Sequence, residues 1–107
     1  MAGEVVVMVS CPASEAEQIS QTLVQEGLVA CVNIMANITS VYQWKGEIVK
    51  EQESLLVIKS SLIVYDRLEA RIKELHSYEI PEIICLAIEN GYAPYLEWLN
   101  STLKIND

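Results

Sequence analysis

The sequence VACVNIMANITSVYQWKGEIVKEQESLLVIK, residues 29–59, decides the fold because it contains two long β patterns around one turn. Apolar and polar side chains follow a period of two, which predicts one long strand over residues 29–44, bent near Asn37. Gly46 predicts the turn, and residues 48–59 then run back as a second long strand. We therefore expect a long antiparallel hairpin.

Two further strands are expected outside the hairpin. Residues 4–10 form an almost continuous apolar run, typical of a strand that is covered on at least one face. Pro12 ends this strand because proline has no N–H to donate to a ladder. Residues 82–89 form a second apolar run, which a turn at Asn90 and Gly91 ends.

Three amphipathic stretches predict helices between and after these strands. Ser14 is the expected N-cap of the first helix, which ends at Gly27. Ser60 or Ser61 is the expected cap of the second helix, and Pro94 opens the third. The residues expected to face the core are Ala16, Ile19 and Leu23 on the first helix, Leu62, Tyr65, Leu68, Ile72 and Leu75 on the second, and Tyr95, Leu99 and Leu103 on the third.

The order β-α-β-β-α-β with a terminal helix predicts an α+β, ferredoxin-like antiparallel sheet with both main helices on one face. With 107 residues in the chain, we expect residues 1–107 to form a single domain. The bare face of such a sheet needs a cover, and the far half of the hairpin, with Tyr42 and Trp44, would expose apolar surface in a monomer. We therefore expect a homo-oligomer.

The charge of the chain excludes two classes of partner. Lys and Arg number 7 and Asp and Glu number 15, which gives a net charge of −8. This charge repels phosphate backbones and anionic membranes and attracts cations, so we expect neither nucleic acid nor membrane as a partner. The apolar run near the N-terminus is too short and lacks the basic flank of a secretory signal, and we expect a cytoplasmic protein.

The sequence contains no catalytic motif, and we do not expect an enzyme. His76, the only histidine, stands at a helix C-terminus, where the dipole favours a structural role. The alternative is ligation of a borderline or soft metal ion such as copper, with a thiolate of Cys11, Cys31 or Cys85 as the sulfur ligand. These three cysteines form no C-x-x-C pair, which suits reduced thiols.

Two charged residues of the second hairpin strand are expected to be partly covered. Glu53 and Lys59 therefore need partners, either one another across a cleft or a bound ligand. The aromatic side chains, including Trp44 and Tyr78, are expected to pack at a subunit contact rather than to stack on nucleic-acid bases, because the chain is acidic.

Four motifs resemble those of the CutA family, the divalent-cation tolerance proteins, and the likeness covers essentially the whole chain. The motifs are LVACVNI at residues 28–34, TSVYQWKG at 39–46, HSYEIPEI at 76–83 and YLEWL at 95–99. The resemblance implies a compact homotrimer of ferredoxin-like subunits, related in architecture to PII-type signal proteins. It also implies divalent-cation binding linked to copper tolerance, no required cofactor and no established enzymatic activity.

The same resemblance implies two groups of site residues. It places His76 and Cys31 at a site for copper or another divalent metal ion. It places four residues around the cleft between subunits, namely Trp44, Glu53, Lys59 and Tyr78. Ser77 stands where the family usually has proline, which loosens the loop after His76.

Three functions follow as hypotheses. The leading hypothesis is a homotrimeric divalent-cation (copper) tolerance protein that binds divalent metal ions. The alternative is a PII-like regulatory module that holds a small anionic metabolite in the inter-subunit cleft, beside Lys59. A third is a scaffold whose trimer presents surfaces to partner proteins.

Overall fold

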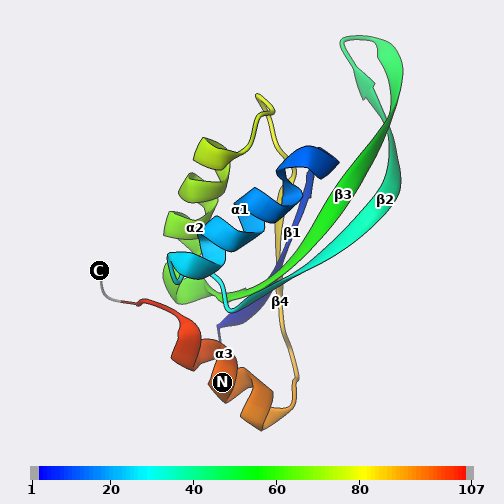
Figure 1. Cartoon of the computed structure of the whole chain (residues 1–107). Coiled ribbons are helices and arrows are strands. Elements are labelled where there is room, and N and C mark those ends of the chain that lie inside the picture. The colour runs from blue at the N-terminus through cyan, green and yellow to red at the C-terminus, as the bar shows by residue number, and fades with distance from the viewer. Residues whose placement is uncertain (1–2, 106–107) are drawn as a thin grey trace.

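The computed structural model describes residues 3–105, and the order of its elements is the predicted one (Figure 1). The elements are β1 (Glu4–Cys11), α1 (Ala13–Gln25), β2 (Cys31–Trp44), β3 (Glu47–Ser61), α2 (Leu62–Leu75), β4 (Ile83–Ala87) and α3 (Ala93–Thr102). Within residues 3–105, none of the helices is long and apolar enough to cross a membrane. The expectation that residues 1–107 form one domain stays a prediction.

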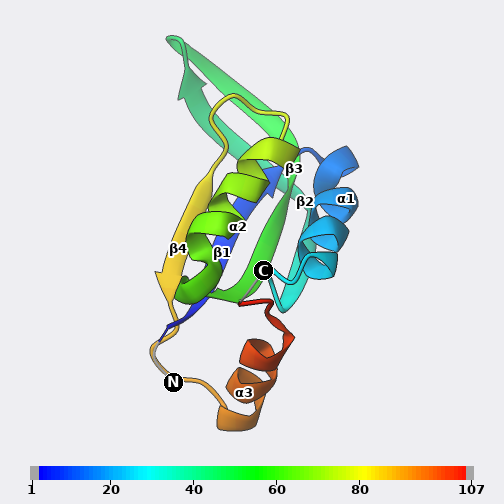
Figure 2. The ribbon, with the colours of Figure 1, turned by 90° about the vertical axis from the view of Figure 1, so that its left-hand side faces the viewer.

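The strands form one antiparallel sheet in the order β2-β3-β1-β4. α1 and α2 both lie on one face of this sheet, and α3 lies beyond the end at which β1 begins (Figures 1 and 2). In the described part of the chain, no helix covers the opposite face, which we call the open face. β4 is shorter than the expected strand at 82–89.

Strand alternation and helical periodicity bring one set of aliphatic residues between the sheet and its two helices. On β1, every second residue from Val5 to Cys11 points toward the helices and is buried. These side chains pack against Leu56 and Ile58 of β3 and against residues of the helices, namely Ala16, Ile19, Leu23, Leu68 and Ile72. The core therefore follows the predicted period in both kinds of element.

The hairpin of β2 and β3 projects from the body of the molecule, whose longest dimension is 44 Å (Figure 1). Lys45 and Gly46 form its turn with φ angles of 53° and 82°, as a two-residue turn of the primed type requires. The predicted bend is confirmed at Asn37, which has a φ of 63° where the pairing register shifts. Asparagine tolerates this left-handed conformation better than most residues.

One predicted helix cap is wrong and one is right. α1 begins at Ala13 with Pro12 as its N-cap residue, so Ser14 lies inside the first turn and caps nothing. Pro12 has a φ of −57°, and the fixed φ of proline leads the chain into the helix without a side-chain cap. At α2, the Ser61 hydroxyl accepts a hydrogen bond from the Ile63 N–H at 3.4 Å, as the sequence predicted.

Two residues expected in the core are exposed, because the stripe on each helix is shifted. Leu62 is 59% exposed, and Val64 is buried in its place. Val64 lies four residues before Leu68, so it continues the buried stripe, whereas Leu62 opens the helix on the solvent side. On α3, Leu96 is buried and Tyr95 is exposed for the same reason.

Candidate functional site

A groove of about 840 Å³ opens between the far half of the hairpin and the loop at residues 77–82. We call it the hairpin groove. Its acidic lining residues are Glu51, Glu53, Glu79 and Glu82, and its aromatic lining residues are Tyr42, Trp44 and Tyr78.

The hairpin and the loop after α2 position the polar groups of this groove. Glu51 and Glu53 are two residues apart on β3, so both point to the same face. The Tyr42 hydroxyl, on the paired strand, donates to Glu51 Oε1 at 2.6 Å. The Tyr78 hydroxyl reaches across from the loop and donates to Glu53 Oε2 at 2.7 Å, with Glu51 Oε1 at 3.5 Å. Glu53 is only 4% exposed.

The two phenols that donate these hydrogen bonds have raised pKa values. The hydrogen bond to Glu51 is the main cause that raises the pKa of Tyr42, to about 12. Burial, followed by the hydrogen bond to Glu53, raises the pKa of Tyr78 well above its ordinary value. Both groups therefore stay protonated near neutral pH and orient the carboxylates without cancelling their charge.

These raised pKa values predict that alkali destabilises the protein. Tyr65, whose pKa burial and Glu69 raise to about 12, belongs to the same group. The folded chain keeps phenolic protons that the unfolded chain releases above about pH 10, so stability falls as the pH rises past that value. We expect denaturant unfolding at about pH 9 and pH 11 to show this loss, with a smaller loss in Tyr78→Phe. Equal losses in the two proteins would contradict the role of Tyr78.

His76 has hydrogen-bond partners at both of its ring nitrogens. It follows the last residue of α2 and is buried, and its backbone N–H donates to the Ile72 carbonyl. Its Nε2 lies 2.7 Å from the Ser10 carbonyl oxygen, and its Nδ1 accepts the Tyr78 N–H at 3.1 Å. The His76 ring also packs against the Tyr78 ring, with 4.7 Å between the two ring centroids. A metal ion could bind His76 only if one of these hydrogen bonds were given up.

Cys31 lies far from His76 within the chain. Across the sheet, Cys31 of β2 pairs with Lys59 of β3, and Lys59 pairs with Val6 of β1. His76 instead lies beside Ser10, whose carbonyl oxygen is hydrogen-bonded to its ring. Val6 and Ser10 are four residues apart, or about 13 Å of strand. Over residues 3–105, no three His, Cys, Asp or Glu side chains are arranged to hold a metal ion.

The other cysteines are buried or partly buried thiols. Cys11 is fully buried at the end of β1, and burial, with Glu15 and Glu53 nearby, raises the pKa of its thiol to about 11. Burial also raises the pKa of the Cys85 thiol. Since the thiolate is the metal ligand, both side chains favour the protonated form that does not ligate.

Of the two alternatives for Glu53 and Lys59, pairing with one another does not occur within the chain. The two residues are six positions apart on β3, which is about 20 Å of strand. The Lys59 ammonium instead donates to Asn33 Oδ1 and to the Val57 carbonyl. The structure thus brings Trp44, Glu53 and Tyr78 together at the hairpin groove and places Lys59 elsewhere.

Sequence reasoning missed three acidic residues of the groove. Glu51 could have been found, because strand alternation places it beside Glu53. Glu79 and Glu82 carry no such signal. Glu82 lines the groove, and its Oε1 accepts the Ser10 hydroxyl at 3.3 Å, a contact between residues 72 positions apart in the sequence.

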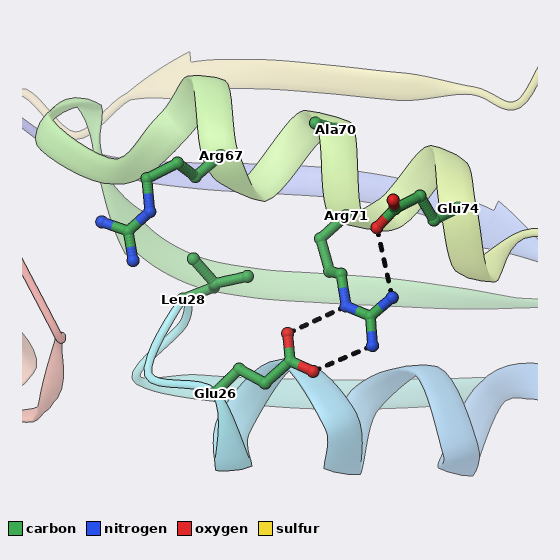
Figure 3. Close-up of a pocket in the computed structure, with 6 residues that line it drawn as sticks. All are labelled: Glu26, Leu28, Arg67, Ala70, Arg71 and Glu74. Atoms are coloured by element: carbon green, nitrogen blue, oxygen red, sulfur yellow. Dashed lines mark hydrogen bonds and ion pairs between the residues drawn. The ribbon is translucent and has the colours of Figure 1, made fainter. Parts of the chain in front are cut away.

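A smaller groove of about 370 Å³ lies between α1 and α2 (Figure 3). Arg71 crosses it and binds both oxygens of Glu26, each at 2.9 Å, and one oxygen of Glu74 at 3.2 Å. The Arg71 guanidinium holds the pKa of Glu26 below its usual value. The charges of Arg71, Glu26 and Glu74 are paired with one another. We therefore interpret this groove as a contact between the two helices and not as a binding site.

The family model described as the CutA1 divalent ion tolerance protein matches residues 5–102. The chain belongs to this family. Among CutA proteins, it is 45% identical over 97 residues to the divalent-cation tolerance protein CutA of Thermus thermophilus, covering 90% of this chain and 94% of that protein. It is 43% identical to the chloroplastic protein CutA of Arabidopsis thaliana, covering 94% of this chain and 56% of that protein. The chain thus spans about half the length of that plant CutA.

Solved CutA1 structures have the same fold. The divalent cation tolerance protein of T. thermophilus superposes with a TM-score of 0.91 at 42% identity, covering 94% of this chain and 98% of that one. CutA1 from Oryza sativa gives a TM-score of 0.93 at 37% identity, covering 95% and 94%. The resemblance expected from the four motifs is therefore confirmed.

Proposed function

We propose that this CutA1-family protein binds divalent metal ions as a homotrimer and contributes to tolerance of copper or another divalent ion. Family membership supports the tolerance role, and the hairpin groove is the observation that carries the binding role. Its lining includes Glu51 and Glu53 but no lysine or arginine. One or two carboxylates suffice to hold a divalent ion that keeps part of its water shell.

The open face of the sheet supports the homotrimer. Met8 is opposite Val57 on one side and Ile84 on the other, so these side chains share that face. Met35 and Leu86, on the edge strands, add to it and are 52% and 48% exposed. An apolar sheet face of this kind needs a cover, and the same face of further copies would provide one.

The hairpin supports the same assembly. Ile48 is 74% exposed next to the turn, and Trp44 is exposed on the paired strand. Apolar residues at the end of a projecting ribbon would find a partner surface on a neighbouring subunit.

The ligands of the metal ion are a separate part of the proposal. His76 and Cys31 are the pair that the family resemblance implies, and two subunits would have to supply them, because they lie far apart in one. Glu51 and Glu53 form the alternative ligand set, within one subunit. The two sets differ in their donor atoms. His76 and Cys31 would supply nitrogen and sulfur to copper or zinc, whereas Glu51 and Glu53 would supply oxygen.

Copper titrations of four proteins separate these ligand sets. We expect Glu53→Gln to weaken binding about tenfold, because it removes one charge from the groove. His76→Ala or Cys31→Ser would weaken binding to a similar degree only if that residue is a ligand. Native mass spectrometry of the same samples gives the subunit count and the metal stoichiometry. Unchanged binding in all three variants would remove Glu53, His76 and Cys31 from the proposed ligands.

A small anionic metabolite does not suit the hairpin groove. The ionisable side chains that line it are glutamates and tyrosines, and Lys59 lies about 20 Å of strand from Glu53. The field in this groove would repel an anion. The metal-ion proposal therefore has the better physical support.

We further propose that the protein is cytoplasmic and not an enzyme, and that it binds neither nucleic acid nor membrane. The reduced-thiol cysteine pattern supports the compartment. The net charge of −8 supports the exclusion of nucleic acid and anionic membranes.

A further inference from the structure

One asparagine of the chain stands directly before a glycine. It is Asn90, which precedes Gly91 in the loop at residues 88–92; this loop joins β4 to α3 at the end of the molecule away from the hairpin turn (Figures 1 and 2). Both residues are exposed and belong to no helix or strand. The residues that support the homotrimer lie on the open face and at the hairpin, outside this loop. Solvent water therefore reaches Asn90.

No contact in the described structure restrains the reactive groups of this pair. Within residues 3–105, the Asn90 side-chain amide and the Gly91 N–H have no hydrogen-bond partner. Glycine has no Cβ, so no side chain crowds the approach of the Gly91 nitrogen to the Asn90 side chain. The Gly91 nitrogen can therefore reach Cγ of Asn90.

The other asparagines within residues 3–105 lack this freedom. Asn33 is paired in the β2–β3 ladder, and its Oδ1 accepts the Lys59 ammonium. Asn37 lies on β2 before an isoleucine, whose branched side chain crowds the backbone nitrogen. Asn100 lies inside α3, and its Nδ2 donates to Glu4 Oε2 at 2.7 Å. Asn90 is thus the described asparagine whose surroundings permit attack by the next backbone nitrogen.

This attack leads to deamidation. The Gly91 nitrogen bonds to Cγ of Asn90, the Cγ–Nδ2 bond breaks, and the Gly91 proton leaves with the amide group as ammonia. The cyclic imide that results then takes up a water molecule. Opening of its Cγ–N bond gives aspartate. Opening at the backbone carbonyl gives isoaspartate, in which the chain runs through the side-chain carbonyl and gains a backbone carbon.

The position of α3 depends on the geometry of this loop. The Ile88 N–H donates to the Glu4 carbonyl at 3.0 Å, which fixes the start of the loop. A Cβ on Gly91 would lie 3.1 Å from the Leu96 side chain, so the Gly91 backbone packs closely on a buried residue of α3. An added backbone carbon and a carboxylate at Asn90 would therefore displace Gly91 or Leu96.

The polar contact that holds α3 is incomplete. Asn100 donates to one oxygen of Glu4, but the other oxygen, Oε1, has no hydrogen-bond partner within residues 3–105, although Glu4 is only 1% exposed. A buried carboxylate oxygen without a partner costs free energy that contact with water would recover. Glu4 therefore favours loosening of α3 once the loop is disturbed.

We propose that Asn90 deamidates spontaneously and that the isoaspartate product loosens α3. The added backbone carbon pushes Gly91 against Leu96, and the movement of α3 gives water access to Glu4. This modification is separate from the proposed metal binding, and its test uses no metal.

Peptide mapping by mass spectrometry of the full chain, stored in warm, mildly alkaline buffer, tests the modification. We expect deamidation to be about tenfold or more faster at Asn90 than at Asn33, since Asn33 must first leave the β2–β3 ladder. A protease that cuts before aspartate but not before isoaspartate identifies the product. Asn90→Gln keeps an amide on a longer side chain that closes the ring slowly, so this position should remain unmodified.

Hydrogen exchange of fresh and deamidated protein tests the effect on α3. We expect the amides of α3 to exchange about tenfold faster after deamidation, with α1 and α2 unchanged. Asn90→Asp adds the charge without the backbone carbon and should exchange as the fresh protein does. Asn90→Gln stored in the same way controls for other changes during storage.

Three results would overturn this proposal. They are deamidation at Asn90 that is no faster than at Asn33, exchange in α3 that deamidation leaves unchanged, and equal loosening of α3 by Asn90→Asp.

Discussion

Leu68→Ala is expected to lower the free energy of unfolding by about 3 kcal/mol. Leu68 is 0% exposed in the middle of α2 and packs in the cluster that joins both helices to the sheet. Truncation removes buried methyl groups and leaves a cavity that the surrounding strands cannot close. Denaturant unfolding at a fixed protein concentration measures the change, since assembly would add a concentration term.

Leu62→Ala is the matched control for this experiment. It makes the same change on the same helix, but Leu62 is largely exposed, so the loss should stay within about 0.5 kcal/mol. A loss at Leu62 as large as that at Leu68 would mean that assembly buries Leu62. A small loss at Leu68 would contradict the core described above.

Val57→Glu is expected to convert the proposed trimer into folded monomers. Val57 lies on the open face opposite Met8 and Asn33, near the middle of the apolar surface. A carboxylate there would be buried against neighbouring subunits, at a cost of several kcal/mol for each copy. Sedimentation velocity measures the subunit count, and circular dichroism checks that the fold is retained.

Val24→Glu controls for the added charge. Val24 is exposed on α1, away from the open face, so this variant should sediment as the unmodified protein does. If Val57→Glu also keeps the assembly of the unmodified protein, the open face is not the subunit interface.

Much of the fold was readable from local patterns. The hairpin turn at Gly46, the bend at Asn37 and the cap at Ser61 each depend on the chemistry of a few neighbouring residues. Prediction failed at Ser14, because α1 begins two residues earlier with Pro12 as its N-cap, and at Leu62, because the buried stripe of α2 begins at Val64. More than one set of apolar residues on a helix can follow the helical period. Packing against the sheet decides which set is buried.

The site was readable only in part. Trp44, Glu53 and Tyr78 line one groove within the chain, and their place at a cleft between subunits stays a prediction. Lys59 was grouped with them, but it lies six residues from Glu53 along an extended strand, and strands separate side chains by about 3.4 Å per residue.

The sequence by itself determined the element order, the alternation of the strands, the acidic charge and the family. Tertiary structure alone decided that Glu82 joins Glu53, that both nitrogens of His76 are engaged, and that Cys31 lies at the other end of the sheet. The physical reason is the range of the interactions. Periodicity, turns and caps act between neighbours in the chain, whereas a groove forms where the loop at residues 77–82 crosses a strand pair far from it in sequence.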